Sequence, residues 1–167
     1  MTHASKSGGY MEIKRDKYLN DLIIRKNNGL VKIITGIRRS GKSYLLNSIF
    51  YDYLLTHGIN ENHIIKFAFD SAVDLDLIGE DFIELEKNKQ KVDPKKFMNY
   101  IKTKILDDET YYLLLDEVQN LGAFESVLNG YLRKNNIDLY VTGSNSKFLS
   151  SDIITEFEGR GDEIHIL

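Results

Sequence analysis

The sequence predicts an α/β domain in which helices cover both faces of a parallel β-sheet. Short apolar, β-branched runs alternate along the chain with segments of helical periodicity. A glycine-containing stretch, GIRRSGKS, joins one such run directly to a helical segment, and another run ends in the adjacent acids Asp116 and Glu117. Buried strands that alternate with helices are typical of parallel sheets, so the carboxyl ends of these strands are expected to share one edge.

The chain has 167 residues, enough for one such domain with a hydrophobic core. We expect the domain to span residues 11–167, because residues 1–10 have the polar, glycine-containing composition of an added leader or a flexible terminus. The 22 basic and 25 acidic residues nearly balance, which argues against a strongly basic nucleic-acid-binding surface. Without cysteine the chain has neither disulfides nor a thiolate metal site. It shows no secretory signal and no apolar run near the ~20 residues that span a bilayer, so we expect a cytoplasmic protein without a membrane partner.

Two helices and two strands are predicted in the first half of the domain. Apolar residues at helical spacing predict a helix over residues 11–28, which ends at Asn27-Asn28-Gly29. The β-branched run at residues 31–35 (VKIIT) predicts a buried parallel strand. After the glycine-containing stretch, residues 44–55 form a second amphipathic helix, and residues 64–69 (IIKFAF) form the second strand.

The second half begins with an ambiguous segment, residues 71–92, which we predict to be an exposed connection with one short helix near residues 81–86. Asp93-Pro94 then combines a capping residue with a proline at the first helical position. The core side of this helix is expected to carry Phe97, Ile101 and Ile105. The remaining predicted elements are strands at 111–115, 137–141 and 163–167, and helices around 124–132 and 151–157.

The stretch GIRRSGKS fits the phosphate-binding pattern G-x-x-x-x-G-K-[ST] at every fixed position. Its glycines let the backbone approach phosphate oxygens, and the N–H groups and the positive end of the following helix favour an anion. Lys42 is predicted to reach the β- and γ-phosphates of a nucleotide, and the Ser43 hydroxyl to bind Mg²⁺. One of the two loop arginines could contact phosphate or an acidic partner while the other points to solvent. The expected nucleotide contacts here are Gly36, Arg38, Arg39, Ser40, Gly41, Lys42, Ser43 and Tyr44.

The apolar run YYLLL is followed by Asp116 and Glu117, and adjacent carboxylates at the end of a buried strand indicate a ligand-facing edge. We predict that Asp116 holds Mg²⁺, through water, opposite Ser43. Glu117 would accept a proton from the water that attacks the γ-phosphate, or orient that water. The alternative is a strand that ends in a solvated acidic turn.

A third strand end carries the polar residues Thr142-Gly143-Ser144-Asn145. Asn145 is the first candidate to position the attacking water or touch the γ-phosphate, followed by Ser144 and then Thr142. The alternative is a turn built from turn-favouring residues.

Arg160 lies between two glycines just before the last predicted strand. An arginine supplied by a neighbouring subunit could stabilise charge on the γ-phosphate, which would require a homo-oligomer. A solvated surface arginine fits the spacing equally well. For the adenine base, Tyr18 or Arg15 on the first helix could flank the ring, although Tyr18 could instead be packed in the core.

The segments GIRRSGKS, LLLDEVQN, VTGSNSKFLS and EGRGDEIHI resemble the prokaryotic AAA-like P-loop ATPases of the AAA-14 type, and the resemblance covers most of the chain from Met11 onward. It implies a P-loop NTPase three-layer α/β/α sandwich with strand order 5-1-4-3-2, ATP and Mg²⁺ as ligands, and ATP hydrolysis. It marks Lys42 and Ser43 as phosphate-loop residues, Asp116 and Glu117 as the acidic pair, Asn145 or Ser144 as a sensor and Arg160 as an arginine finger. Relatives continue into a helical lid and further domains, so we expect this chain to be an ATPase core without them.

Three functions are therefore weighed. The leading hypothesis is an ATPase core whose turnover drives a conformational change on a protein or nucleic-acid client. The second is a nucleotide-binding switch with little hydrolysis. The third is a small-molecule kinase, for which the sequence shows no acceptor pocket.

Overall fold

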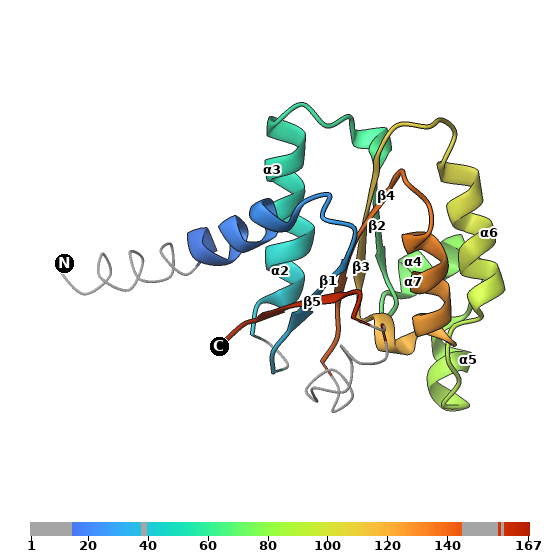
Figure 1. The fold of residues 1–167 in the computed structure, drawn as a ribbon. Helices are drawn as coiled ribbons and strands as arrows, with labels where there is room; N and C mark the ends of the chain where they lie inside the picture. The colour runs from blue at the N-terminus through green and yellow to red at the C-terminus, as the bar shows by residue number, and fades with distance from the viewer. Residues whose placement is uncertain (1–14, 38–39, 145–156, 158) are drawn as a thin grey trace.

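Five parallel strands form the centre of the molecule in the order β2-β3-β4-β1-β5 (Figure 1). The computed structural model describes residues 15–37, 40–144, 157 and 159–167. Read from the opposite edge, the strand order is 5-1-4-3-2, so the expected topology is confirmed. The strands are β1 (Val31–Thr35), β2 (Ile64–Ala68), β3 (Tyr111–Asp116), β4 (Ile137–Thr142) and β5 (Gly161–His165).

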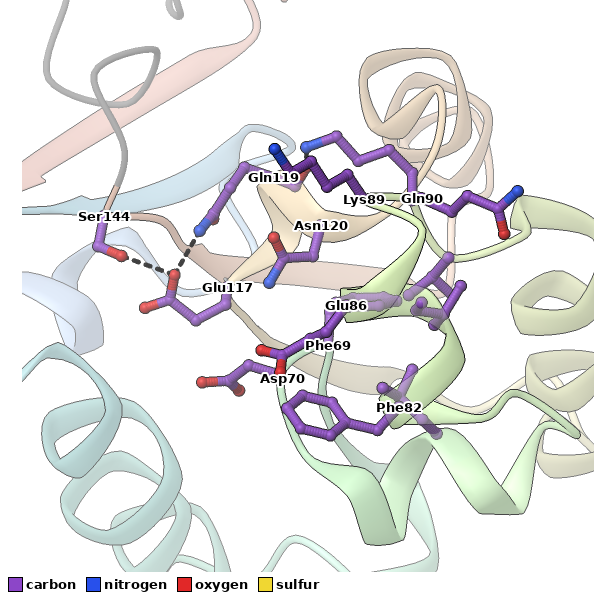
Figure 2. A pocket seen from close by; sticks show the side chains of 14 residues that line it. Phe69, Asp70, Phe82, Glu86, Lys89, Gln90, Glu117, Gln119, Asn120 and Ser144 are labelled. Atoms are coloured by element: carbon purple, nitrogen blue, oxygen red, sulfur yellow. Dashed lines mark hydrogen bonds between the residues drawn. The ribbon is translucent and has the colours of Figure 1, made fainter.

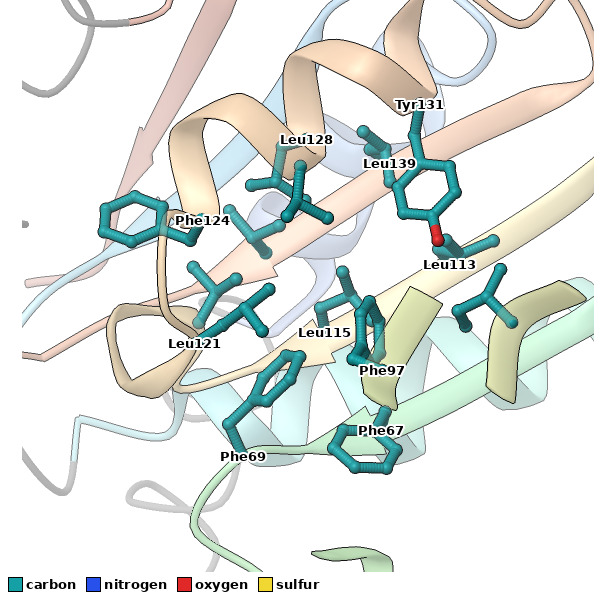
Figure 3. Close-up of a cluster of buried hydrophobic side chains, with 14 of the residues drawn as sticks. Phe67, Phe69, Phe97, Leu113, Leu115, Leu121, Phe124, Leu128, Tyr131 and Leu139 are labelled. Carbon is teal, nitrogen blue, oxygen red and sulfur yellow. The ribbon is translucent and has the colours of Figure 1, made fainter. Parts of the chain in front are cut away.

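Helices cover both faces of this sheet and produce three layers, as predicted (Figure 1). Consecutive strand residues point to opposite faces, so Ile33 and Ile34 of β1 belong to two separate hydrophobic clusters. One cluster joins the sheet to the N-terminal helix (residues 15–25) and to the helix after residues 36–43. Residues 36–43 (GIRRSGKS) are called the phosphate-binding stretch because they fit that sequence pattern. The other cluster joins the sheet to α4 (Ala72–Leu77), α5 (Phe82–Lys87), α6 (Pro94–Lys104) and α7 (Phe124–Leu132); Figure 3 shows its aromatic and leucine side chains.

The helix after the phosphate-binding stretch begins at Lys42, two residues earlier than predicted. It runs without interruption through α2 (Lys42–Tyr44), a π-helical segment η1 (Leu45–Phe50) and α3 (Tyr51–Thr56). Its buried apolar side chains are Leu45, Leu46, Phe50 and Leu54, and all four lie within the predicted amphipathic helix.

Residues 71–92 differ from the prediction, because they form two helices rather than an exposed connection with one. The predicted short helix exists as α5, with Asp81 as its N-cap, but α4 was missed. Helix α4 is anchored by the buried Leu75, and its first turn is capped by the Ser71 hydroxyl, which accepts a hydrogen bond from the Asp74 N–H. A six-residue helix with one deeply buried side chain produces no apolar period that a sequence could reveal.

The other elements differ from the prediction only at their ends. The Asp93 side chain accepts from the Lys95 N–H and caps α6, as expected, and Ile105 lies just beyond that helix, packed against the core. Strand β5 begins at Gly161 rather than residue 163, because its pairing with β1 begins opposite Val31. The segment 151–157 expected to be helical lies outside the described residues except for Phe157, as does the leader 1–10. Among the described helices, none is both long enough and apolar enough to cross a membrane.

Candidate functional site

The phosphate-binding stretch connects the end of β1 to the start of α2, and two glycines shape it. At Gly36 a Cβ would lie 2.8 Å from the Ser40 hydroxyl oxygen and 2.9 Å from the Ile166 carbonyl oxygen, so no side chain fits there. Gly41 has φ 93°, in the left-handed region, directly before the first helical residue. Both fixed glycines of the pattern are therefore required by backbone geometry.

Lys42 is held inside this stretch. Only 4% of the residue is exposed, and its Nζ donates to the carbonyl oxygens of Gly36 (3.0 Å) and Ile37 (2.9 Å). Burial lowers the pKa of the ammonium group, while the nearby carboxylates of Glu117 and Asp116 act in the opposite direction. The amine is thus close to the acidic pair but forms no salt bridge with the described carboxylates.

Ser43 and Asp116 are 73 residues apart in sequence, and the fold brings their side chains into contact. The Ser43 Oγ lies 2.9 Å and 2.7 Å from the two carboxylate oxygens of Asp116, and its single proton is donated to this carboxylate. Thr142, at the end of the neighbouring strand β4, also donates its hydroxyl to Asp116. Hydroxyl and carboxylate oxygens are the hard donors that Mg²⁺ prefers, so the residues present fit that ion.

Glu117 has the left-handed backbone conformation (φ 54°, ψ 49°), which is uncommon for a residue with a side chain. This turn follows β3 directly and is fixed by a hydrogen bond from the Glu117 N–H to the Thr142 hydroxyl (2.9 Å). Its carboxylate accepts hydrogen bonds from the Ser144 hydroxyl (2.7 Å) and the Gln119 side-chain amide (2.5 Å), as Figure 2 shows. Gln119 was not among the sequence-predicted site residues, although it belongs to the DEVQN motif.

A cavity of about 560 Å³ opens beside Glu117, on the side of the sheet that carries α4 and α5 (Figure 2). Its walls combine carboxylates, aromatic rings and a hydroxyl, and include Phe69, Asp70, Phe82, Glu86, Glu117 and Ser144. Asp116 therefore contacts Ser43 of the phosphate-binding stretch, while Glu117 lines a separate cavity.

A second cavity, of about 210 Å³, lies between the N-terminal helix and the first turn of α2. The Arg15 guanidinium stands 5.0 Å from the centre of the Tyr44 ring, and the Tyr18 hydroxyl accepts from the Leu167 N–H at 3.1 Å. Its walls, which include Ser40 and Gly41, are mainly apolar. The two residues predicted to flank an adenine ring thus line one cavity next to the phosphate-binding stretch.

Arg160 lies at the amino ends of the strands, opposite the ends that carry Ser43 and Asp116. It directly precedes β5, and its carbonyl oxygen accepts from the N–H of Val31, the first residue of β1. A five-residue strand, at roughly 3.3 Å a residue, separates it by about 15 Å from the edge that carries Ser43 and Asp116. The predicted site residues Arg38, Arg39 and Asn145 lie outside the described residues.

Comparison with protein families identifies the type of domain that the chain forms. A model of the AAA-14 family, an AAA domain, matches residues 28–167. An uncharacterised protein of Haemophilus influenzae is 34% identical over 155 residues, which cover 92% of this chain and 35% of that protein. An uncharacterised protein of Methanocaldococcus jannaschii is 26% identical, over 92% of this chain and 30% of that protein. The chain thus spans about a third of the curated relatives it matches.

Solved structures share the fold at low identity. A Drosophila ORC structure with AT-rich DNA and Cdc6 has a TM-score of 0.56 at 12% identity and covers 98% of this chain and 59% of that chain. AMPPCP-bound DnaA from Aquifex aeolicus has a TM-score of 0.51 at 19% identity and covers 89% of this chain and 44% of that chain. At these identities the likeness concerns the arrangement of the sheet and its helices.

Proposed function

This chain belongs to the AAA-14 family of AAA domains, and we propose that it binds ATP with Mg²⁺ and hydrolyses it to drive a conformational change. The observation that carries the proposal is the contact between Ser43 and Asp116, because it brings a hydroxyl and two acids to the edge of the sheet where Lys42 lies. Such a set, at the carboxyl ends of parallel strands, is suited to a triphosphate with its metal ion.

Each residue then has a distinct task. Lys42 would exchange its loop carbonyl partners for phosphate oxygens and neutralise part of their charge. Ser43 and Asp116 would hold Mg²⁺, which supplies charge neutralisation at the phosphates. Glu117 would accept a proton from the attacking water, or orient it. Ser144, which donates a hydrogen bond to Glu117, would then lie near the same water.

The adenine base is proposed to occupy the cavity beside the N-terminal helix. Its apolar walls suit a flat heterocycle, and Gly41 and Ser40 connect it directly to the phosphate-binding stretch. Arg15 and Tyr44, which stack on each other, would then contact the base from one side. Replacing Tyr44 with alanine is expected to weaken the binding of ATP more than the binding of inorganic triphosphate. Competition against a fluorescent nucleotide measures both affinities.

Arg160 is proposed to act on a neighbouring copy of the chain. Its place at the opposite edge of the sheet prevents it from reaching the phosphates bound by its own subunit, but suits an arginine that projects toward the next one. Homo-oligomerisation would therefore complete the site. Mixing Arg160→Ala chains with Lys42→Ala chains tests this proposal, because each variant supplies what the other lacks and partial activity should return.

The deciding experiment is phosphate release with Mg-ATP, comparing the wild-type chain with Glu117→Gln. Loss of a general base is expected to lower kcat by about 10²- to 10⁴-fold. Glu86→Gln is the matched control, because Glu86 lines the cavity beside Glu117 but has no assigned role in the chemistry. Equal, substantial rates in wild type and Glu117→Gln would remove Glu117 from its role, and tight ATP binding without turnover would identify a switch.

A second candidate function is phosphoryl transfer to a small acceptor. One observation favours it: the cavity of about 560 Å³ reaches Glu117 and Ser144 and offers the acceptor space that the sequence did not reveal. The acidic pair on β3 and the polar end of β4 favour hydrolysis instead. Labelled γ-phosphate recovered only as inorganic phosphate, in the presence of candidate acceptors, would exclude transfer.

A further inference from the structure

The carboxylate of Glu117 is fixed through one of its two oxygens. Oε2 accepts hydrogen bonds from both the Gln119 amide (2.5 Å) and the Ser144 hydroxyl (2.7 Å), as Figure 2 shows. Among the described residues, none donates a hydrogen bond to Oε1. The two donors therefore set the rotation of the carboxylate and leave one oxygen available to a water molecule.

Gln119 is itself firmly held. It lies on the short 3₁₀ turn η3 (Val118–Asn120) and is only 8% exposed. The main-chain carbonyl oxygen of Gln119 accepts from the Lys91 ammonium group (2.9 Å), and the main-chain carbonyl oxygen of Asn120 accepts from the Val92 N–H (2.8 Å). This turn is thus fastened to residues 91–92, which follow α5, so the Gln119 side chain approaches Glu117 from a rigid support.

The orientation of the Gln119 amide satisfies Glu117 at a cost to Gln119. Its Nε2 donates to Glu117, whereas its Oε1 is buried and has no partner among the described residues. A buried acceptor without a donor is unfavourable. The reversed orientation would place Oε1 against the carboxylate, so the arrangement retains the one amide orientation that supports Glu117. The left-handed backbone of Glu117 is a second cost at the same point.

We propose that Gln119 is a positioning residue, which holds Oε2 of Glu117 so that Oε1 faces the attacking water. This inference rests on the proposed ATP hydrolysis, in which Glu117 accepts the proton of that water. Gln119 touches neither nucleotide nor water in this scheme and acts only through Glu117. Its loss should therefore lower turnover without weakening nucleotide binding.

The test uses Gln119→Met, which keeps the length of the side chain but removes its N–H donor. A misplaced base is expected to lower kcat for Mg-ATP by roughly 10- to 100-fold, while the Kd for a fluorescent ATP analogue changes less than about twofold. Asn120→Ala is the matched control, because the Asn120 side chain lines the same cavity and makes no hydrogen bond to Glu117 among the described residues. Its kcat should equal that of wild type.

A double variant separates positioning from general disruption. If Gln119 acts only through Glu117, then adding Gln119→Met to Glu117→Gln should change the residual rate by less than about twofold. An equal fold loss in both backgrounds, or an unchanged kcat in the single variant, would overturn the inference. If Gln119→Met does not fold, Lys91→Met replaces it as the test. Lys91 is exposed, and its loss removes one hydrogen bond that holds the turn carrying Gln119. The kcat should then fall at unchanged affinity, and an unchanged kcat overturns the inference.

The two failures are distinguishable. A wild-type rate no higher than that of Glu117→Gln ends the proposed hydrolysis and this inference with it. If Glu117→Gln abolishes turnover but Gln119→Met retains the wild-type rate, only this inference fails and the proposed hydrolysis stands.

Discussion

Two lysine–aspartate sets lie at opposite ends of the parallel strands, at the amino edge and the carboxyl edge of the sheet. The two sets differ in whether the lysine pairs with the aspartate. At the amino edge, Lys32 of β1 and Asp138 of β4 form a direct ion pair with a 2.5 Å contact, and both side chains are almost completely buried. At the carboxyl edge, Lys42 donates to loop carbonyl groups, while Asp116 accepts from the hydroxyls of Ser43 and Thr142. The same two residue types are thus paired at one edge and held apart at the other.

This difference separates a structural role from the proposed functional one. Burial lowers the pKa of Lys32, and the adjacent Asp138 carboxylate opposes that effect, so the two charges compensate each other within the protein. Such a pair has no charge left for a ligand. Lys42 and Asp116, both within the described residues, do not form an ion pair with each other. A triphosphate and a metal ion require such unpaired groups.

The largest expected effect is the loss of stability in Lys32→Met. Removal of one partner leaves the Asp138 charge buried and unpaired, which costs about 3–5 kcal/mol in the free energy of unfolding. Chemical denaturation with urea measures this change. Nucleotide affinity of the folded fraction should match wild type, because the pair lies at the edge away from the phosphate-binding stretch.

A second substitution isolates the cause. In Lys32→Met/Asp138→Asn no charge remains buried, and the amide oxygen can still accept from the Asn27 N–H and the Tyr140 hydroxyl. The double variant should therefore be more stable than Lys32→Met. If Lys32→Met alone lowers the free energy of unfolding by less than about 1 kcal/mol, the pair does not stabilise the amino edge.

The same substitution at the other edge, Lys42→Met, should act on binding rather than on stability. Charged hydrogen bonds are worth about 1.5–3 kcal/mol, so the affinity for ATP is expected to fall by roughly 10- to 100-fold or more. The unfolding free energy should change little, because the variant loses two carbonyl contacts but no longer buries a charge. Calorimetric titration and thermal unfolding of one preparation test both statements, and a large stability loss with normal affinity would contradict the comparison.

The fold and part of the site could be predicted because their signals are local. Residues 111–115 are apolar or aromatic throughout, residues 31–35 are mainly β-branched, and the loop pattern predicts Lys42 and Ser43 as site residues from fixed spacing alone. The contact of Ser43 with Asp116 was expected because parallel strands place their carboxyl ends together.

The remainder depends on contacts between distant segments. The partner of Lys32 is 106 residues away, and a buried lysine in a strand gives no sign of which acid it meets. The role proposed for Gln119 depends on the left-handed turn at Glu117, which brings the amide back onto the carboxylate. Helix α4 was missed because a single deeply buried side chain, Leu75, produces no periodicity.

The smallest effect concerns Tyr140, whose buried hydroxyl donates to Asp138 at 2.6 Å. Tyr140→Phe keeps the ring in contact with Phe50 and removes only this donor. Because Asp138 retains Lys32 and the Asn27 N–H, the free energy of unfolding should fall by about 1.5 kcal/mol, the lower end of the range for a hydrogen bond to a charged group. Hydrolysis and nucleotide affinity should be unchanged, since the amino edge serves stability. If Tyr140→Phe instead slowed turnover at constant stability, the two edges would be coupled and the division between them would be wrong.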